Sequence, residues 1–145
     1  MLSKASKYAI TAVLYLTNSS NKQHKLGSKQ IAKALDIPAP FLAKTLQELT
    51  KKKIISSVKG PNGGFYLSKE NENNTLFDII ACIDDVEKFN DCYLGQFECN
   101  EDKPCVVHHL YFPFKNELIN KLKTKTILEM SNEYAHNNNL TQILK

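Results

Sequence analysis

The chain of 145 residues carries a net charge of +4, and 42% of its side chains are hydrophobic. A chain of this length can bury one modest core, and two independent domains are not expected. The sequence shows neither a signal peptide nor an apolar run of about 18 residues, so it predicts a cytoplasmic protein outside the membrane. Its four cysteines should therefore remain reduced thiols, which argues against a disulfide framework.

The charge is divided unequally between two halves of the chain. Residues 1–69 contain 12 lysines and two acids, Asp36 and Glu48, so this half carries +10. Residues 70–145 contain 7 lysines and 13 acids, so this half carries −6. A basic half attracts a phosphate backbone, because each neutralised phosphate releases counterions. The plainer interpretation is a solvated lysine surface.

The first elements predicted are three helices. An apolar helix is expected over Leu2–Thr17. A second begins at Ser28, whose hydroxyl can cap the first turn, and ends near Asp36. Pro38 and Pro40 disfavour helix at the residues before them, whereas their own fixed φ suits the opening of a third helix. This arrangement predicts a helix-turn-helix.

A small hairpin is predicted directly after these helices. Its strands are expected over Ile54–Val58 and Phe65–Leu67. The connecting residues 60–64 have the sequence Gly-Pro-Asn-Gly-Gly, in which proline presets φ and the later residues tolerate positive φ. The predicted fold is therefore mainly α with a small β wing: a winged helix-turn-helix domain over residues 1–74, followed by residues 75–145.

The winged helix predicts which side chains would contact DNA. The chain contains no arginine, so base reading would depend on lysine, polar side chains and DNA shape. A helix N-terminus should meet phosphate, the third helix should lie in the major groove, and the wing should enter or flank the minor groove. The candidates for the phosphate contact are Ser28 and Lys29, and those for the major groove are Pro40, Lys44 and Thr45. The candidates on the wing are Lys59, Pro61, Asn62, Gly63 and Gly64.

Three of the four cysteines lie close together in an acidic stretch without helical periodicity, residues 84–103 and just beyond. They are Cys92, Cys99 and Cys105, and the third is expected to start a helix on which His108 and His109 share its face. Thiolates and imidazole suit zinc and iron–sulfur clusters alike, and inert or redox thiols are equally compatible with the spacing. The spacing alone leaves these three interpretations open.

The remaining elements are helical. Thr75 and Asp78 resemble a capping box that opens a helix. A long helix is expected from Val106 onward, with Pro113 inside it. Thr126 and Glu129 then resemble a second capping box. The long helix carries an apolar stripe suited to packing on its own domain or on a partner helix, formed by Val107, Leu110, Tyr111, Phe114, Leu118 and Leu122.

Three segments resemble the Rrf2 family of winged-helix transcriptional regulators: residues 4–9 (KASKYA), residues 30–32 (QIA) and the wing sequence VKGPNGGFYL of residues 58–67. The resemblance extends over nearly the whole chain. It implies a homodimer that pairs through the long helix after residue 105 and binds a palindromic operator on double-stranded DNA. It also implies a regulator and not an enzyme.

The resemblance further implies a cofactor. Family members with three cysteines in this loop bind an iron–sulfur cluster, and the IscR-like branch adds a histidine three residues after the last cysteine, which is His108 here. A [2Fe–2S] cluster is favoured and a [4Fe–4S] cluster is possible. Six residues separate Cys92 from Cys99, where relatives commonly have five. Other candidates for the fourth ligand are His109, Glu101 and Asp102. In the NsrR branch, a carboxylate from the partner's first helix is the fourth ligand. That ligand is not expected here, because no acidic residue precedes Asp36.

Three functions remain under consideration at this point. The expected one is a dimeric DNA-binding regulator, a repressor, whose sensor loop over residues 84–105 reports iron–sulfur, redox or nitric-oxide status. The second is a cluster-free Rrf2 regulator controlled by zinc, thiol oxidation or a partner protein, as in the CymR-like branch. The third is a small redox protein, against which the basic first half argues.

Overall fold

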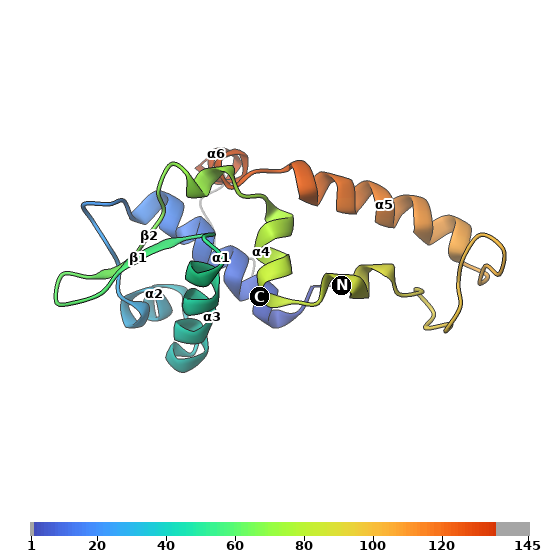
Figure 1. Ribbon diagram of the computed structural model, residues 1–145, viewed down its shortest axis with the longest axis horizontal. Coiled ribbons are helices and arrows are strands. Elements are labelled where there is room, and N and C mark those ends of the chain that lie inside the picture. Colours follow the sequence, from blue (N-terminus) through green and yellow to red (C-terminus); the bar gives the residue numbers. More distant parts are fainter. Residues whose placement is uncertain (1, 136–145) are drawn as a thin grey trace.

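The protein, described here by a computed structural model over residues 2–135, is mainly helical with one two-stranded antiparallel sheet. Figure 1 shows α1 to α4, α6 and the wing gathered into one body, from which α5 extends. The expected winged-helix fold class is therefore confirmed. The elements are α1 Lys4–Ser19, α2 Ser28–Leu35, α3 Ala39–Lys51, β1 Ser56–Val58, β2 Gly64–Tyr66, η1 Asn71–Asn73, α4 Leu76–Ile83, η2 Val86–Asn90, α5 His108–Thr124 and α6 Ile127–Ala135.

Helix α1 is the central element of the core. Its N-cap is Ser3, whose hydroxyl accepts a hydrogen bond from the Ser6 amide at 3.0 Å. It contacts α3, α4 and α6, so nearly all of its circumference is covered by other helices of the same chain. Its apolar composition follows from that position. Its buried apolar residues are Ala9, Ala12, Val13, Leu14 and Leu16.

The helix-turn-helix is formed by α2 and α3, with one correction at its start. Gly27, and not Ser28, is the N-cap of α2, and no side chain caps it. The Gly27 carbonyl already accepts from the Ile31 amide at 3.0 Å, so Ser28 is the first helical residue. Asp36 ends α2 in the left-handed conformation, with φ at 55°. Pro40 lies in the first turn of α3, where its fixed φ suits the helix.

The wing is shorter than predicted. Strands β1 and β2 pair Ser57 with Phe65 at the centre of the register. Ile54 and Ile55 belong to the core instead, because Lys53 adopts a left-handed conformation with φ at 59° and turns the chain inward as α3 ends. The sheet therefore begins only at Ser56, after two residues anchored in the core.

The wing is also tied to the loop that precedes α2. Leu26 and Phe65 exchange two backbone hydrogen bonds, of 2.9 and 2.8 Å. Gly64 adopts a φ of 145°, and a Cβ at this position would lie 2.8 Å from the Leu26 carbonyl oxygen. Only glycine fits this close approach.

Both predicted capping boxes are present. Thr75 and Asp78 exchange side-chain to backbone hydrogen bonds of 2.8 and 3.2 Å at the start of α4. Thr126 and Glu129 do the same at the start of α6, at 2.9 and 3.2 Å. These two N-termini are joined by a backbone bridge between Thr75 and Thr126. The end of α5 is thereby held against the start of α4.

Helix α5 begins later than expected, and its apolar stripe is only partly covered. Cys105 precedes the helix, because the chain first makes a turn in which the His108 amide donates to the Cys105 carbonyl at 3.1 Å. Leu118 and Leu122 pack with Ile80 and Phe89 in a second, small core. Farther along the same stripe, Leu110 is 78% exposed. Pro113 lies within the continuous helix.

Within residues 2–135, no helix combines the length and the hydrophobicity that a membrane span requires. The asparagine run of residues 137–139 and the tail after it, which the sequence predicts to be peripheral, lie outside the described residues.

Candidate functional site

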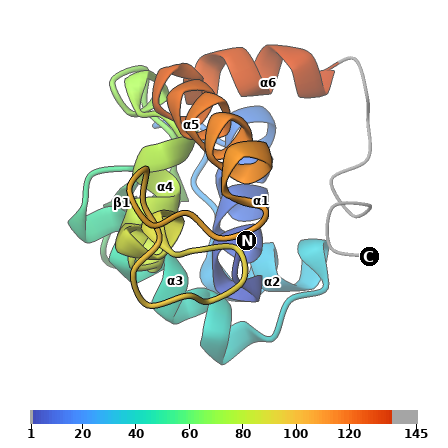
Figure 2. The ribbon, with the colours of Figure 1, turned by 90° about the vertical axis from the view of Figure 1, so that its right-hand side faces the viewer.

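The segment between α4 and α5 brings the three cysteines together. Figure 2 looks along α5 onto this segment, which loops beneath the N-terminal end of the helix. The three sulfur atoms of Cys92, Cys99 and Cys105 lie within 4.8 Å of one another. The sulfurs of Cys92 and Cys105 are 3.6 Å apart. Cys92 and Cys105, thirteen positions apart in the sequence, therefore lie with their thiols in contact.

Tight turns within the loop produce this approach. Gly95 has a φ of 77°, and its amide donates to the Cys92 carbonyl at 3.0 Å. The Asn100 side chain accepts from the amides of Asp102 and Lys103 at 3.0 and 2.9 Å. This turn reverses the chain between the second and third cysteines. The Cys105 amide consequently points at the Cys99 sulfur, at 3.5 Å.

His108 completes the group of side chains. It is 7% exposed, and its Nδ1 lies 3.1 Å from the Cys99 sulfur. Its ring stacks on Phe112, with the ring centroids 5.2 Å apart. Its Nε2 is buried and has no hydrogen-bond partner among the described residues. A buried ring nitrogen without a partner is unfavourable, and the ring nitrogen that faces the cysteines is Nδ1.

The cysteines differ in how readily they ionise. Burial raises the pKa of the Cys92 thiol, but hydrogen bonds from the backbone of Gln96 and Leu94 outweigh this effect and lower the pKa to about 7. At Cys99, the backbone hydrogen bond from Cys105 lowers the pKa, but burial and the neighbouring thiols of Cys92 and Cys105 outweigh it and leave the pKa raised. Neighbouring thiols resist simultaneous ionisation, because a second negative charge is repelled by the first. A bound cation would remove that repulsion.

These side chains line one cavity of about 310 Å³. Three soft sulfur donors and an imidazole are the donor set that zinc and iron–sulfur clusters accept. With the Nδ1 of His108 3.1 Å from the Cys99 sulfur, the residues fit such a group. Glu101 also lines the cavity, whereas His109 and Asp102 are exposed side chains outside that lining. Among the candidate fourth ligands, the structure brings His108 to the cysteines.

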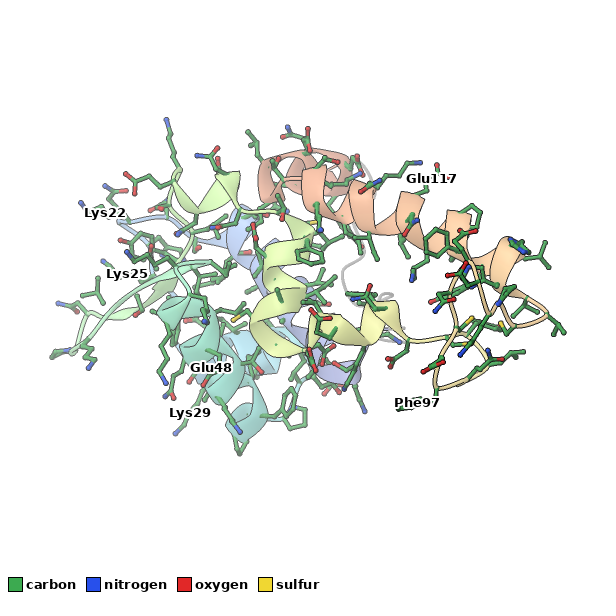
Figure 3. The ribbon with its side chains drawn as sticks, turned by 45° about the vertical axis from the view of Figure 1, so that its right-hand side comes forward. Lys22, Lys25, Lys29, Glu48, Phe97 and Glu117 are labelled. Carbon is green, nitrogen blue, oxygen red and sulfur yellow. The ribbon has the colours of Figure 1, made fainter. Side chains whose placement is uncertain are left out.

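The basic residues gather at the other end of the molecule. Figure 3 shows Lys22, Lys25 and Lys29 at the end that carries the wing, and Phe97 of the cysteine loop at the opposite end. Lys44 on α3 and Lys59 on the wing are both exposed. This charge lies on the helix-turn-helix and its wing, as a surface that contacts phosphates requires.

The wing tip is a tight turn. The Gly63 amide donates to the Gly60 carbonyl at 2.9 Å, which leaves Pro61 and Asn62 exposed at the tip. A Cβ on Gly63 would lie 2.1 Å from the Val58 carbonyl oxygen, so the turn admits no side chain there. Between the wing and α3 runs a groove of about 480 Å³ whose lining includes Gln47, Lys51, Ser57 and Lys59.

Two of the predicted contact residues on α2 and α3 are less accessible. Ser28 is half-buried. Thr45 is only 5% exposed, and its hydroxyl donates to the Phe41 carbonyl at 3.0 Å. Thr45 therefore faces the core because it shares the inner face of α3 with Leu42 and Leu49. The expected major-groove contact of Thr45 is not available in this structure, whereas Gln47 and Lys44 are exposed.

The cysteine cavity includes a nearly buried lysine that was not expected from the sequence. Lys115 lines it and is 7% exposed. The available signal was its spacing: seven residues after His108 is the same face of an α-helix. A lysine on a helix is ordinarily expected in solvent, so this spacing carries little weight without the tertiary structure.

Comparison with known proteins identifies similar chains. Residues 2–133 match the family profile named Rrf2, described as an iron-dependent transcriptional regulator. An inferred HTH-type transcriptional regulator of Aquifex aeolicus is 39% identical over 134 residues, which cover 91% of this chain and 92% of the relative. The HTH-type transcriptional regulator IscR of Escherichia coli is 26% identical over 131 residues, covering 90% of this chain and 80% of the relative.

Solved structures share the fold. The structure of CymR, the global cysteine regulator of B. subtilis, superposes with a TM-score of 0.72 at 19% identity, covering 92% of this chain and 97% of that one. The structure of T. potens IscR superposes with a TM-score of 0.70 at 20% identity, covering 95% and 90%.

Proposed function

Because this chain belongs to the Rrf2 family of transcriptional regulators, whose members bind DNA and are not enzymes, we propose that it is a dimeric cytoplasmic regulator that senses through an iron–sulfur cluster. The cluster would be held by Cys92, Cys99, Cys105 and His108. A [2Fe–2S] cluster is the proposed form and [4Fe–4S] the alternative. One observation carries the proposal: three sulfurs lie within 4.8 Å of one another, and the Nδ1 of the buried His108 lies 3.1 Å from one of them, the Cys99 sulfur.

The side chains of the site have separate roles in holding the group. When bound, an iron–sulfur cluster supplies a one-electron redox couple that oxidants can disturb. Cys92, with its pKa of about 7, offers a thiolate near neutral pH. The Asn100 turn keeps Cys99 and Cys105 adjacent, and His108 offers a ring nitrogen from the first turn of α5.

The proposed DNA surface consists of exposed residues at the other end of the molecule. Lys29 would neutralise phosphate at the start of α2, and Lys44 with Pro40 would lie along the major groove. Lys59 and the turn at residues 61–64 would contact the minor groove. Residues 1–74 are proposed as the DNA-binding domain, and the chain from residue 75 onward as the sensing and pairing part.

Pairing is proposed to use the exposed stripe on α5. Leu110 and Phe114 are large apolar side chains that residues 2–135 leave exposed. A second copy would cover them and would fix the separation of two recognition helices. A fixed separation is what allows a dimer to match the two half-sites of a palindromic operator.

A direct contact connects the sensing segment to the DNA-binding half. The Asp84 carboxylate, at the end of α4, accepts from the Ser6 hydroxyl at 2.7 Å and from the Ser3 amide at 3.4 Å. Burial raises the pKa of Asp84, but these hydrogen bonds outweigh it and lower the pKa overall. A change in the packing of residues 84–105 would thus reach the start of α1 and shift the population of DNA-competent dimers.

Anaerobic purification followed by absorption spectroscopy tests the cluster. We expect a coloured protein whose charge-transfer bands are lost in Cys92→Ala and retained in Cys82→Ala, because Cys82 lies outside the cavity. A colourless wild-type protein containing one equivalent of zinc would overturn the iron–sulfur proposal.

The second candidate function is the cluster-free one. The sulfurs of Cys92 and Cys105 are 3.6 Å apart, and Cys92 ionises near neutral pH, so a two-electron oxidant could join them in a disulfide. This candidate predicts that a peroxide changes the DNA affinity of metal-free protein. Loss of the peroxide response in Cys105→Ser would support it.

A further inference from the structure

Lys115 is a charged side chain in an unusual position. It is 7% exposed, and lysines are rarely buried unless an opposite charge is close. No carboxylate of residues 2–135 forms an ion pair with it within 4.0 Å, whereas Lys103, Lys121 and Lys125 each have such a partner. A lysine side chain with this little exposure and no ion pair among residues 2–135 leaves its ammonium available to a negatively charged group bound nearby.

The surroundings of Lys115 indicate where that partner would bind. Its Nζ lies 5.1 Å from the centroid of the Phe112 ring, and the other neighbour of that ring is His108, stacked at 5.2 Å. His108, Phe112 and Lys115 follow one another at spacings of four and three, so they occupy one face of α5. Lys115 also lines the same cavity as the three cysteines.

A cysteine site that holds a metal group would supply the negative charge with which Lys115 forms no ion pair among residues 2–135. Three thiolates carry more negative charge than the positive charge of a zinc ion or of an oxidised [2Fe–2S] core. Because a neutral imidazole adds no charge, the loaded site has a net negative charge. Reduction of a cluster adds one further negative charge. The two carboxylates on the cavity lining, Asp91 and Glu101, are both exposed and would add to the negative charge.

We propose that the ammonium of Lys115, on the lining of the cysteine cavity, is the counter-charge of the cysteine site, which strengthens binding of the metal group and raises the reduction potential of a bound cluster. The inference rests on the proposed function, because it assumes that these cysteines bind a metal group. A positive charge in a poorly solvated cavity favours the more negative of two redox states. Lys115 thus acts on the bound group through its positive charge and is not one of its ligands.

Three substitutions isolate the charge. Lys115→Met removes it while keeping an unbranched side chain, and Lys115→Arg keeps it. Lys121→Met is the matched control, because Lys121 lies on the same helix with its side chain 73% exposed and paired with Glu117 at 3.0 Å. Far-ultraviolet circular dichroism and a thermal melt check that each variant is folded. If Lys115→Met melts early, Lys115→Gln replaces it.

The first measurement is a spectroelectrochemical titration of the anaerobic, cluster-loaded protein. At the wild-type midpoint, we expect the ratio of reduced to oxidised cluster to fall about tenfold in Lys115→Met, which corresponds to about 59 mV for one electron. Lys115→Arg and Lys121→Met should stay within about twofold of wild type. An unchanged midpoint in Lys115→Met would overturn the inference.

The second measurement uses cadmium on the reduced, metal-free full chain and does not depend on a cluster. Thiolate-to-cadmium absorption should show about tenfold weaker binding in Lys115→Met than in Lys121→Met. If the wild-type protein never acquires a cluster, the iron–sulfur proposal fails and the cadmium titration alone decides the role of Lys115. Equal cadmium affinities in all variants would reject that role.

Discussion

The two ends of this molecule are built differently. The wing end rests on one continuous core to which α1, α2, α3, α4 and α6 all contribute, and its hairpin is tied back to Leu26 by backbone hydrogen bonds. Among the residues that the structure describes, the cysteine end has no comparable core; its nearest buried cluster is the small one that contains Phe89. Tyr93, Leu94 and Val106 are largely exposed there, and Phe97 is 100% exposed. Turns within the loop and the contact of the Tyr93 ring with Tyr111 of α5, 5.0 Å between centroids, hold this segment.

The difference indicates which end can respond to a signal. Residues that pack in a core resist rearrangement, whereas a loop held by a few hydrogen bonds opens at low free energy. The wing end should therefore keep its shape whether or not a metal group is bound. The cysteine end should become well ordered only when its donor atoms and its exposed apolar side chains have partners.

The largest expected effect concerns the uncovered stripe of the cysteine end. The double substitution Leu110→Asp, Phe114→Asp places charges where a second copy is proposed to pack, and we expect the dimer dissociation constant to rise by at least about a hundredfold. Sedimentation velocity measures it. Leu128→Asp, on α6, is the control because Leu128 is also exposed but lies off α5. A double variant that remains dimeric would place the pairing surface elsewhere.

The next effect compares two neighbouring histidines. His108→Ala removes the buried imidazole beside Cys99, so we expect the cluster to be lost at least about tenfold faster under air. His109→Ala removes an exposed imidazole one residue away and should leave the decay rate unchanged. Decay of the visible absorption gives both rates. Equal decay in the two variants would remove His108 from the proposed ligands.

At the wing end, a single lysine is expected to matter less. Lys59→Ala removes one proposed phosphate contact, so operator affinity should fall about fivefold at moderate salt. The slope of log affinity against log salt should decrease by about 1. Fluorescence anisotropy over a series of salt concentrations provides both values, with Lys121→Ala, in the last turn of α5 and outside the helix-turn-helix, as the control. Binding that does not vary with salt would contradict the assigned surface.

The smallest effect tests the contact between the two ends. Asp84→Asn weakens the hydrogen bonds to Ser6 and Ser3, and we expect a loss of about 1 kcal/mol in the free energy of unfolding at pH 7. The folded-state pKa of Asp84 is lowered, so its contribution is present above its unfolded pKa of about 3.9 and disappears as the pH falls through the lower folded value.

Urea unfolding of both proteins at several pH values measures this contribution. The difference between wild type and Asp84→Asn should be constant near neutral pH and should shrink as the solution is acidified below about pH 4. A difference that grows on acidification would show that the carboxylate is not stabilised by these hydrogen bonds.

Local features of the fold could be predicted because they depend on residues near one another in the chain. Both capping boxes, the turn at Asp36 and the glycine-rich wing follow from side chains three or four positions apart or from backbone preferences. The lysine-rich first half and the spacing of the cysteines could likewise be recognised in the sequence. These signals were sufficient for the fold class and for the neighbourhood of the metal donors.

Only the tertiary structure decided the features that join distant parts of the chain. Asp84 meets Ser6 across 78 positions, Thr45 turns inward because α3 packs on the core, and Ile54 enters the core instead of the sheet. The same holds for Lys115, whose burial arises from how the cysteine loop folds under α5. The sequence by itself determined the local geometry and the chemistry available, since these act over a few residues. Which charges become buried and which faces stay open depended on the packing of the whole chain.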